Sequence, residues 1–156
     1  MPQSLSKVAL HLIFSTKDRI RAITYHDLRR QLEGYIVGIL KNMDCPSLAT
    51  RCLIDHAHIL FLLSRTKTVA QVVQTVKQES SSWIKQQMPD RKDPYLSKFG
   101  WQRGYGVFSV SESRISVVKK YVEGQEEHHK RVTFQEEYRE ILDKHNVAYD
   151  EKYVWD

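Results

Sequence analysis

The chain has 156 residues, a length that ordinarily forms one domain able to bury a core without disulfides. Its hydrophobic share of 41% and aromatic share of 10% are those of an ordinary globular protein and exclude an intrinsically disordered chain. No apolar run approaches the roughly 18 residues needed to cross a bilayer. The N-terminal stretch lacks the features of a signal peptide. We therefore expect a cytoplasmic protein with no membrane partner.

The formal net charge of +5 is unevenly distributed. Residues 132–156 hold three basic side chains against seven acidic ones, whereas residues 1–131 hold 21 basic against 12 acidic. A basic body favours a polyanionic partner, because each neutralised phosphate releases condensed counterions. On charge alone, a solvated basic surface without a partner is an equally good interpretation.

The first half of the chain predicts three strands and two helices. Residues 7–15 alternate between apolar and polar positions, which is typical of a strand, and residues 24–42 carry an apolar stripe at helical spacing. Two apolar strands are expected at about 48–54 and 56–63. A second amphipathic helix is expected from about 67 to 87.

The second half predicts one more strand and two more helices. Residues 88–103 are rich in proline and charge and favour a loop, and residues 104–110 form a strand. A third helix is expected over about 112–130, and Thr133 with Glu136 can cap a last one. The order β-α-β-β-α-β predicts an α+β, ferredoxin-like (RRM-like) antiparallel sheet, with an additional C-terminal helix and tail.

Two histidines interrupt the third strand, which reads LIDHAHILFLL over residues 53–63 and is otherwise apolar. Because side chains alternate along a strand, His56 and His58 emerge from the same face, close enough to hold one ion. Burying such groups unpaired is costly, so they need partners. The alternative is that both are hydrogen-bonded histidines of the core or the sheet edge, since an H-x-H pair often occurs by chance.

The third helix carries a tyrosine and a glutamine four residues apart. At that spacing Tyr121 and Gln125 lie on the same helix face, about 40° apart in projection. Gly124 between them lowers helix stability and lets another group approach closely or the helix bend. In isolation, a core tyrosine and a surface glutamine would be the better explanation of the pair. The adjacent His128 and His129 diverge by roughly 100° on a helix, and we leave them out of the site.

The sequence resembles the single-tyrosine HUH transposases of small bacterial insertion sequences (IS200-like transposases). In that family a His-hydrophobic-His strand meets a Tyr-x-x-x-Gln helix. The similarity covers nearly the whole chain, and five blocks occur in the family's order and spacing: FSTKDR at 14–19, DHAHILFLL at 55–63, KQESSSWI at 77–84, WQRGYGVFSVS at 101–111 and YVEGQEEHH at 121–129. The central residue of the first motif, Ala57, is smaller than the usual branched residue, but its side chain points away from the metal.

The resemblance implies a DNA transposase that cleaves and rejoins single-stranded DNA. His56, His58 and Gln125 would bind one divalent ion, Mg²⁺ or Mn²⁺, and Tyr121 would be the nucleophile that forms a 5′-phosphotyrosine. Lys119 and Lys120 would add positive potential that favours the phenolate. Residues 1–131 would form the catalytic domain, and residues 132–156 would add a C-terminal helix and acidic tail to it.

The resemblance also implies the partners. The substrate would be single-stranded DNA with hairpins near the ends of the element, with no nucleotide cofactor, in the nucleoid of a bacterium or archaeon. A homodimer is expected, in which the tyrosine helix of one subunit completes the site of the other. Candidate contacts to phosphates and bases combine charge and stacking, although each could be an ordinary surface or core residue: Lys17, Arg19, Arg21, Lys77, Trp101, Arg103, Lys119 and Lys120.

Three other functions stay open at this stage. A non-catalytic RNA-recognition domain shares the fold, and RGYGVFSV at 103–110 comes near its ribonucleoprotein motif, but Val107 stands where an aromatic residue should stack. Such a module gives no reason for the two histidines and the glutamine. A replication initiator or a domesticated transposase would share the chemistry. A simple metal-dependent hydrolase would leave no covalent adduct with DNA.

Overall fold

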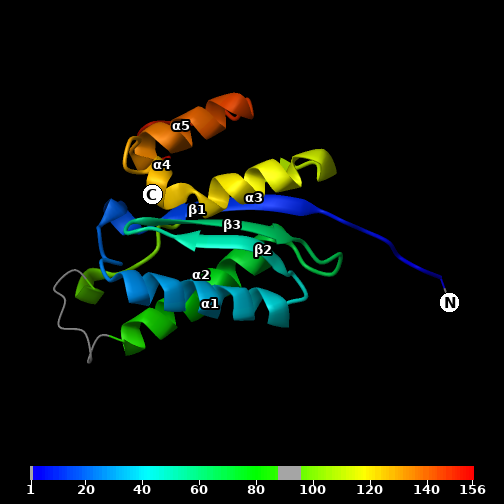
Figure 1. The fold of residues 1–156 in the computed structure, drawn as a ribbon, viewed down its shortest axis with the longest axis horizontal. Coiled ribbons are helices and arrows are strands. Elements are labelled where there is room, and N and C mark those ends of the chain that lie inside the picture. The colour runs from blue at the N-terminus through cyan, green and yellow to red at the C-terminus, as the bar shows by residue number, and fades with distance from the viewer. Residues whose placement is uncertain (1, 88–95) are drawn as a thin grey trace.

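Four strands form one antiparallel sheet in the computed structural model, which describes residues 2–87 and 96–156 (Figure 1). The strand order is β2-β3-β1-β4, so β1 and β3 lie in the middle of the sheet. In chain order the strands and α-helices are β1 (Ala9–Ser15), α1 (His26–Asn42), β2 (Ser47–Cys52), β3 (His56–Leu62), α2 (Val69–Gln86), β4 (Gly106–Val110), α3 (Ile115–Glu123), α4 (Gln125–His128) and α5 (Phe134–Lys144).

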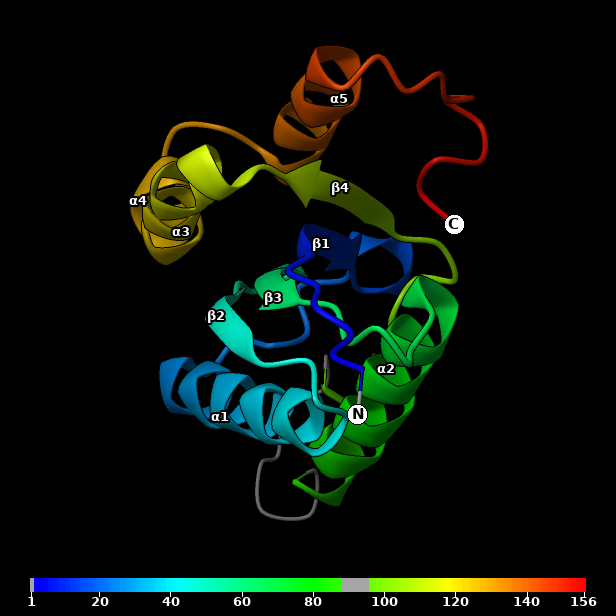
Figure 2. The ribbon, with the colours of Figure 1, turned by 90° about the vertical axis from the view of Figure 1, so that its right-hand side faces the viewer.

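The helices α1 and α2 cover one face of the sheet (Figure 2). The apolar stripe of α1 and the alternate residues of β1 that share one face pack together in a large buried core, which includes Leu12, Phe14 and Leu32. A capping box fixes the start of α2, because the Thr68 side chain accepts from the Gln71 amide and the Gln71 side chain accepts from the Thr68 amide. This arrangement confirms the predicted ferredoxin-like β-α-β-β-α-β fold.

The predicted boundaries differ from the observed ones by a few residues, with one larger exception. The single helix expected over 112–130 is divided into a 3-10 turn, η4 (Glu112–Arg114), and the two helices α3 and α4. The loop expected over 88–103 lies partly outside the described residues, and its described part contains η3 (Leu96–Lys98) and a bridge between Thr16 and Trp101. No helix in the described ranges is long and apolar enough to cross a bilayer.

The C-terminal helices lie over the opposite face of the sheet (Figure 2). A second core cluster joins β1 and β4 to α5, with Phe108 and Tyr138 among its buried members, and Trp155 of the aromatic C-terminus packs against it. Val122 of α3 packs in a third cluster with Leu60 of β3. Side chains that leave this face of β1 and β3 therefore meet α3, α4 and α5.

The docking of α5 on the sheet depends on close contact between Tyr138 and Gly106. A methyl group added at Gly106 would lie 2.7 Å from the Tyr138 hydroxyl oxygen and 2.8 Å from its ring. The start of α5 is fixed by the predicted capping box between Thr133 and Glu136. Together these contacts set the position of every side chain on α5.

Substituting Gly106 with alanine should destabilise the protein by about 1–3 kcal/mol, because the methyl group overpacks the contact with Tyr138. Urea unfolding measures this change. Gly38→Ala is the matched control: no atom lies within 4 Å of its added methyl group, and helix propensity predicts a gain of about 0.5–1 kcal/mol. Equal stability of Gly106→Ala and the wild type would mean that Tyr138 does not pack as described.

Candidate active site

The two histidines of β3 emerge from the same face of the sheet, as predicted. His56 is 1% exposed and His58 is fully buried, and their ring centroids are 5.2 Å apart. Ala57, between them, packs into the core on the other side with α1 and α2. The strand alternation that predicted the pair thus directs both imidazoles towards the C-terminal helices.

Each imidazole has a hydrogen-bond partner on its outer nitrogen. His56 Nδ1 lies 2.7 Å from Asp55 Oδ1, and His58 Nδ1 lies 2.9 Å from Nε2 of His11 on β1. Burial lowers the pKa of His56 to about 4 and that of His11 to about 3. His56 is therefore neutral at neutral pH and donates its Nδ1 hydrogen to Asp55, which leaves a lone pair on Nε2 facing inward.

The tyrosine and the glutamine lie on two short helices that meet at Gly124. Gly124 takes a non-helical conformation (φ −89°, ψ 10°), which ends α3 and begins α4. The break corrects the predicted continuous helix, but it keeps the pair together, because Gln125 Nε2 donates to the Tyr121 carbonyl oxygen over 3.3 Å. Gln125 is fully buried, and its Oε1 has no hydrogen-bond partner among the described residues.

The Tyr121 hydroxyl donates a short hydrogen bond to Glu137 Oε2 of α5. The Tyr121 ring centroid lies 5.8 Å from that of His58 and 6.1 Å from that of His11. Burial and the Glu137 carboxylate both raise the pKa of Tyr121 above its ordinary value. The Tyr121 hydroxyl contacts the Glu137 carboxylate, whose negative charge favours the phenol over the phenolate, and Lys119 and Lys120 are exposed on α3.

Glu137 is the residue on which these groups converge, and the sequence patterns did not single it out. It is 1% exposed, and its Oε1 lies 2.9 Å from His58 Nε2 and 3.0 Å from His129 Nε2. Burial alone raises the pKa of this carboxyl, but the neighbouring His58 and hydrogen bonds from His129, His58 and Tyr121 outweigh burial and hold the net pKa below its ordinary value. Its place in the buried stripe of α5, between Phe134 and Tyr138, was the signal that could have revealed it.

The two adjacent histidines of α4 and the following turn also reach this carboxylate. His129 Nε2 lies 3.1 Å from His56 Nε2, and His128 Nε2 lies 3.1 Å from Glu137 Oε2 without the geometry of a hydrogen bond. Their ring planes are perpendicular, with the centroids 5.3 Å apart. The Glu137 carboxylate nevertheless contacts both histidines. The prediction that left His128 and His129 out of the site was therefore wrong about where they lie.

Four side chains form a group that could hold a metal ion: His56, His58, His129 and Glu137. One ligand atom from each lies within 4.8 Å of all the others. The geometry therefore brings a half-buried tyrosine hydroxyl, inward-facing imidazoles and a carboxylate together in one cluster, a set of groups that enzyme sites commonly use.

Comparison with known proteins identifies the family. The family model described as "Transposase IS200 like" matches residues 4–125. The chain belongs to the IS200-like transposase family. No curated protein matches it at a significant level.

Two solved structures share the fold of this IS200-like transposase. A protein of Deinococcus radiodurans assigned as a transposase is 22% identical, with 80% of this chain and 95% of that chain covered and a TM-score of 0.62. A REP-associated tyrosine transposase bound to a REP hairpin is 12% identical, with 85% and 74% covered and a TM-score of 0.60. At these identities the likeness establishes the common fold.

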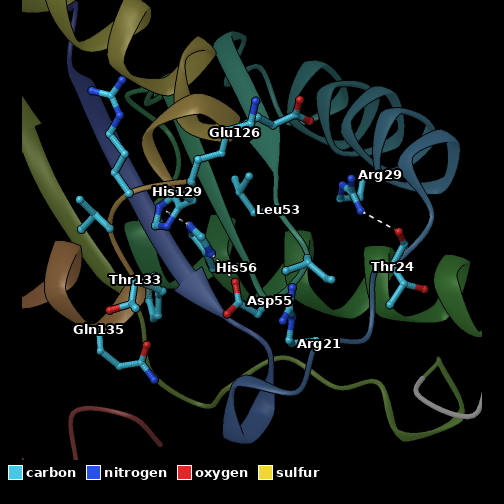
Figure 3. Close-up of a pocket in the computed structure, with 15 residues that line it drawn as sticks. Arg21, Thr24, Arg29, Leu53, Asp55, His56, Glu126, His129, Thr133 and Gln135 are labelled. Atoms are coloured by element: carbon cyan, nitrogen blue, oxygen red, sulfur yellow. Dashed lines mark hydrogen bonds and ion pairs between the residues drawn. The ribbon is translucent and has the colours of Figure 1, made fainter.

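A cleft of about 660 Å³ opens beside the cluster, and His56, His129 and Asp55 form part of its wall (Figure 3). Its other charged lining residues are mostly basic: Arg21, Arg29, Lys130 and Arg131, against Glu126. Arg29 donates to the backbone carbonyls of residues 23 and 24. The exposed residues Arg21, Lys130 and Arg131 leave the cleft basic next to His56.

The remaining DNA-contact candidates lie in three places. Exposed Lys17 and Arg103 line a second cleft of about 400 Å³ together with Trp101 and Trp155, and the Arg19 guanidinium stacks over the Trp155 ring. Lys119 and Lys120 lie exposed on α3. Lys77 directs its ammonium group at three backbone carbonyls, of residues 102, 103 and 104, so it supports the loop before β4 and has no hydrogen left for a phosphate.

The resemblance to an RNA-recognition domain does not extend to the surface that such a domain uses. The C-terminal helices cover the sheet face that would carry stacked bases (Figure 2). Phe108 of the near-motif on β4 is 6% exposed and packs under α5. An open aromatic platform, which single-stranded RNA requires, is therefore absent from the described part of this face.

Proposed function

We propose that this protein cleaves and rejoins single-stranded DNA at the ends of an insertion sequence through a 5′-phosphotyrosine on Tyr121. The observation that carries the proposal is the buried cluster in which the Tyr121 phenol lies beside the β3 histidines, with its ring centroid 5.8 Å from that of His58. Membership of the IS200-like family supports a transposase. No acid–base carboxylate pair or Ser-His-Asp set suggests a different chemistry among the described residues.

In the proposed cleavage step the Tyr121 oxygen attacks the scissile phosphorus, a bond forms between them, and the bond from phosphorus to the 3′ oxygen breaks. The hydroxyl hydrogen points at Glu137 Oε2, which can accept it, and the departing 3′ oxygen gains a proton. The products are a 5′-phosphotyrosine and a strand with a free 3′-hydroxyl. Because this linkage preserves the energy of the phosphodiester, another 3′-hydroxyl can attack it and rejoin strands without ATP.

We further propose that His56, His58 and Gln125 hold a divalent ion, Mg²⁺ or Mn²⁺. The residues fit such an ion, because His56 Nε2 faces the cluster with a lone pair and Gln125 Oε1 is a buried oxygen without a hydrogen-bond partner in the described part of the chain. When bound, the ion supplies positive charge that polarises and orients the scissile phosphate. These neutral side chains would leave its charge available for the phosphate.

Single-stranded DNA with hairpin ends is the proposed substrate. The REP-associated tyrosine transposase of the same fold binds a REP hairpin, and the basic cleft beside His56 provides a path by which a strand could reach Tyr121. For phosphate contact we retain the exposed candidates, which are Lys17, Arg21, Arg103, Lys119 and Lys120. Arg19 and Trp101 stay candidate contacts at the second cleft.

The double substitution Arg21→Gln with Arg131→Gln should weaken binding of single-stranded DNA and reduce its salt dependence. Each lost phosphate contact on a single strand lowers the slope of log K against log salt by about 0.7, so we expect a reduction of about 1.4. Fluorescence anisotropy at several salt concentrations measures it. The control, Lys85→Gln with Lys144→Gln, removes the same charge from exposed helix positions that do not line the cleft. An equal effect in the control would reject the cleft as the DNA path.

We propose a homodimer in the nucleoid as the working form, with residues 1–131 as the catalytic domain and residues 132–156 as an extension of the same domain. The hydrogen bond from Tyr121 to Glu137 supports assigning residues 132–156 to the same domain, because it makes α5 a wall of the site.

The proposed function is tested by incubating the purified chain with labelled single-stranded DNA from the flanks of its own gene and Mg²⁺ or Mn²⁺. We expect a labelled adduct that survives denaturant and disappears on protease treatment. Cleavage without any adduct would indicate a hydrolase. Tight RNA binding without DNA cleavage would indicate a recognition module.

A further inference from the structure

We propose that His129 and Glu137 bind the divalent ion directly, together with His56 and His58, and that the site therefore selects a transition-metal ion such as Mn²⁺ or Zn²⁺ over Mg²⁺. This inference rests on the proposed function for the presence of an ion at the β3 histidines. In this ligand set His129 and Glu137 take the place proposed above for Gln125, and both come from the segment after α3.

The inward atoms of the four side chains converge as ligands of one ion would. His58 Nε2 and His129 Nε2 lie 2.9 and 3.0 Å from the same oxygen, Oε1 of Glu137. His56 Nε2 lies 3.1 Å from His129 Nε2 and 3.8 Å from that oxygen. Ligand atoms about 2.1 Å from a metal are about 3.0 Å apart along an octahedral edge and about 3.4 Å apart along a tetrahedral edge, so the shorter contacts match octahedral edges and lie a few tenths of an ångström inside tetrahedral ones.

The outer atoms of the β3 histidines are already used. Asp55 accepts from His56 Nδ1, and His58 Nδ1 shares a hydrogen with His11 Nε2. Metal-binding histidines commonly have such a partner on the second ring nitrogen, since it fixes the tautomer and the ring orientation. Without an ion, Glu137 Oε1 accepts a hydrogen bond from His58 Nε2. With an ion bound, His58 would instead donate its Nδ1 hydrogen to His11, so that the Nε2 atoms of His56 and His58 both carry lone pairs beside the carboxylate oxygen, which is also an acceptor. A cation between them satisfies all of these acceptors at once.

The two oxygens of Glu137 have different neighbours. Oε1 faces the histidines, whereas Oε2 accepts from the Tyr121 hydroxyl. An uncompensated carboxylate beside the nucleophile would repel an approaching phosphodiester. An ion bound at Oε1 would reverse the local charge and leave Oε2 in contact with the nucleophile, so one residue would connect the metal to Tyr121.

The type of ligand determines the metal preference. Imidazole nitrogen suits Zn²⁺ and other transition metals, while Mg²⁺ prefers oxygen ligands and retains several waters. Three imidazoles and one carboxylate would therefore bind Mg²⁺ poorly. Both added ligands lie beyond residue 125, where the match to the family model ends. Their placement depends on this chain's own contacts: the amide of His129 donates to the Gln125 carbonyl oxygen, and the Thr133 cap starts α5.

Cobalt binding to the full chain tests the ligand set without DNA. Co²⁺-loaded wild type should show the intense visible bands of a four-coordinate ion, and calorimetry should give at least about 100-fold tighter binding of Zn²⁺ than of Mg²⁺. His129→Gln and Glu137→Gln should each weaken Zn²⁺ binding by roughly 100-fold or more and alter the cobalt spectrum. Gln125→Ala should weaken it less than about tenfold. The matched controls are the exposed His26→Gln and Glu140→Gln, which should behave as wild type.

The opposite pattern would overturn the inference: loss of binding in Gln125→Ala, with wild-type affinity and spectrum in His129→Gln and Glu137→Gln. X-ray absorption on the Zn²⁺-loaded wild type gives an answer that does not depend on any variant folding. Three coordinated imidazoles are expected, and two would contradict the inference. The covalent DNA adduct is assayed separately. An adduct without this ligand set rejects only the inference, whereas this ligand set without an adduct rejects only the proposed function.

Discussion

Tyr121→Phe is expected to lose strand cleavage by more than roughly 10⁴-fold and to form no covalent adduct, while still binding hairpin DNA like the wild type. Removing the nucleophile of a covalent catalyst commonly has an effect of this size. The phenylalanine ring retains the packing against His58 and His11. Glu137 keeps its contacts with His58 and His129, so the lost hydrogen bond should change the free energy of unfolding by only about 1 kcal/mol.

Single-turnover cleavage of labelled DNA, read beside an anisotropy assay for binding, separates these effects. The matched control is Tyr35→Phe, an exposed tyrosine of α1 that stacks on Trp83 far from Tyr121 in sequence. The control should cleave at the wild-type rate. Cleavage by Tyr121→Phe at that rate would exclude Tyr121 as the nucleophile.

The same variant distinguishes the two subunits of a dimer. The resemblance implied a tyrosine supplied by the partner, but in this chain Tyr121 donates to Glu137 of its own α5. We therefore expect that mixing Tyr121→Phe with a metal-site variant restores no activity. Recovery of cleavage in the mixture would instead mean that the tyrosine acts on the site of the other subunit.

His56→Ala is expected to lower metal affinity by more than roughly 100-fold and to abolish adduct formation at ordinary metal concentrations. Changes in residues that only support a ligand lower affinity by about 10- to 100-fold, so loss of the ligand itself should have at least that effect. The substitution also removes a buried side chain that contacts Asp55, His129 and Phe134. Calorimetric titration of the metal and adduct yield against metal concentration are the two measurements.

His26→Ala is the control for this substitution, because His26 is exposed at the start of α1. It should leave both measurements unchanged. Wild-type activity of His56→Ala with an unaltered dependence on metal would remove His56 from the ligand set. A folded variant that binds metal normally but forms no adduct would instead indicate a role for His56 in orienting the substrate.

The sequence predicted the features that depend on local periodicity. Alternation along β3 placed His56 and His58 on one face, and helical spacing placed Gln125 near Tyr121 even though the helix breaks between them. Both follow from repeat geometry over a few residues. The ferredoxin-like fold also followed, because the alternation of strands and helices restricts the topology to few solutions.

The contacts missed from the sequence are those that depend on tertiary packing. Glu137 is 79 residues from His58, and His11 is 47 residues from it. Strand alternation shows that His11 faces away from the main core, but not that β1 lies beside β3 or that α5 closes over both. The sequence also did not show that a carboxylate 16 residues away contacts the Tyr121 hydroxyl, whereas the effect of Lys119 and Lys120 on Tyr121 stays a prediction.

Mass spectrometry of the protein–DNA adduct tests the central claim most directly. After nuclease and protease digestion, the account predicts one modified peptide, with a nucleotide joined through its 5′-phosphate to the oxygen of Tyr121. A nucleotide attached to any other residue, or an unmodified Tyr121 peptide from a sample in which the DNA has been cut, would contradict it.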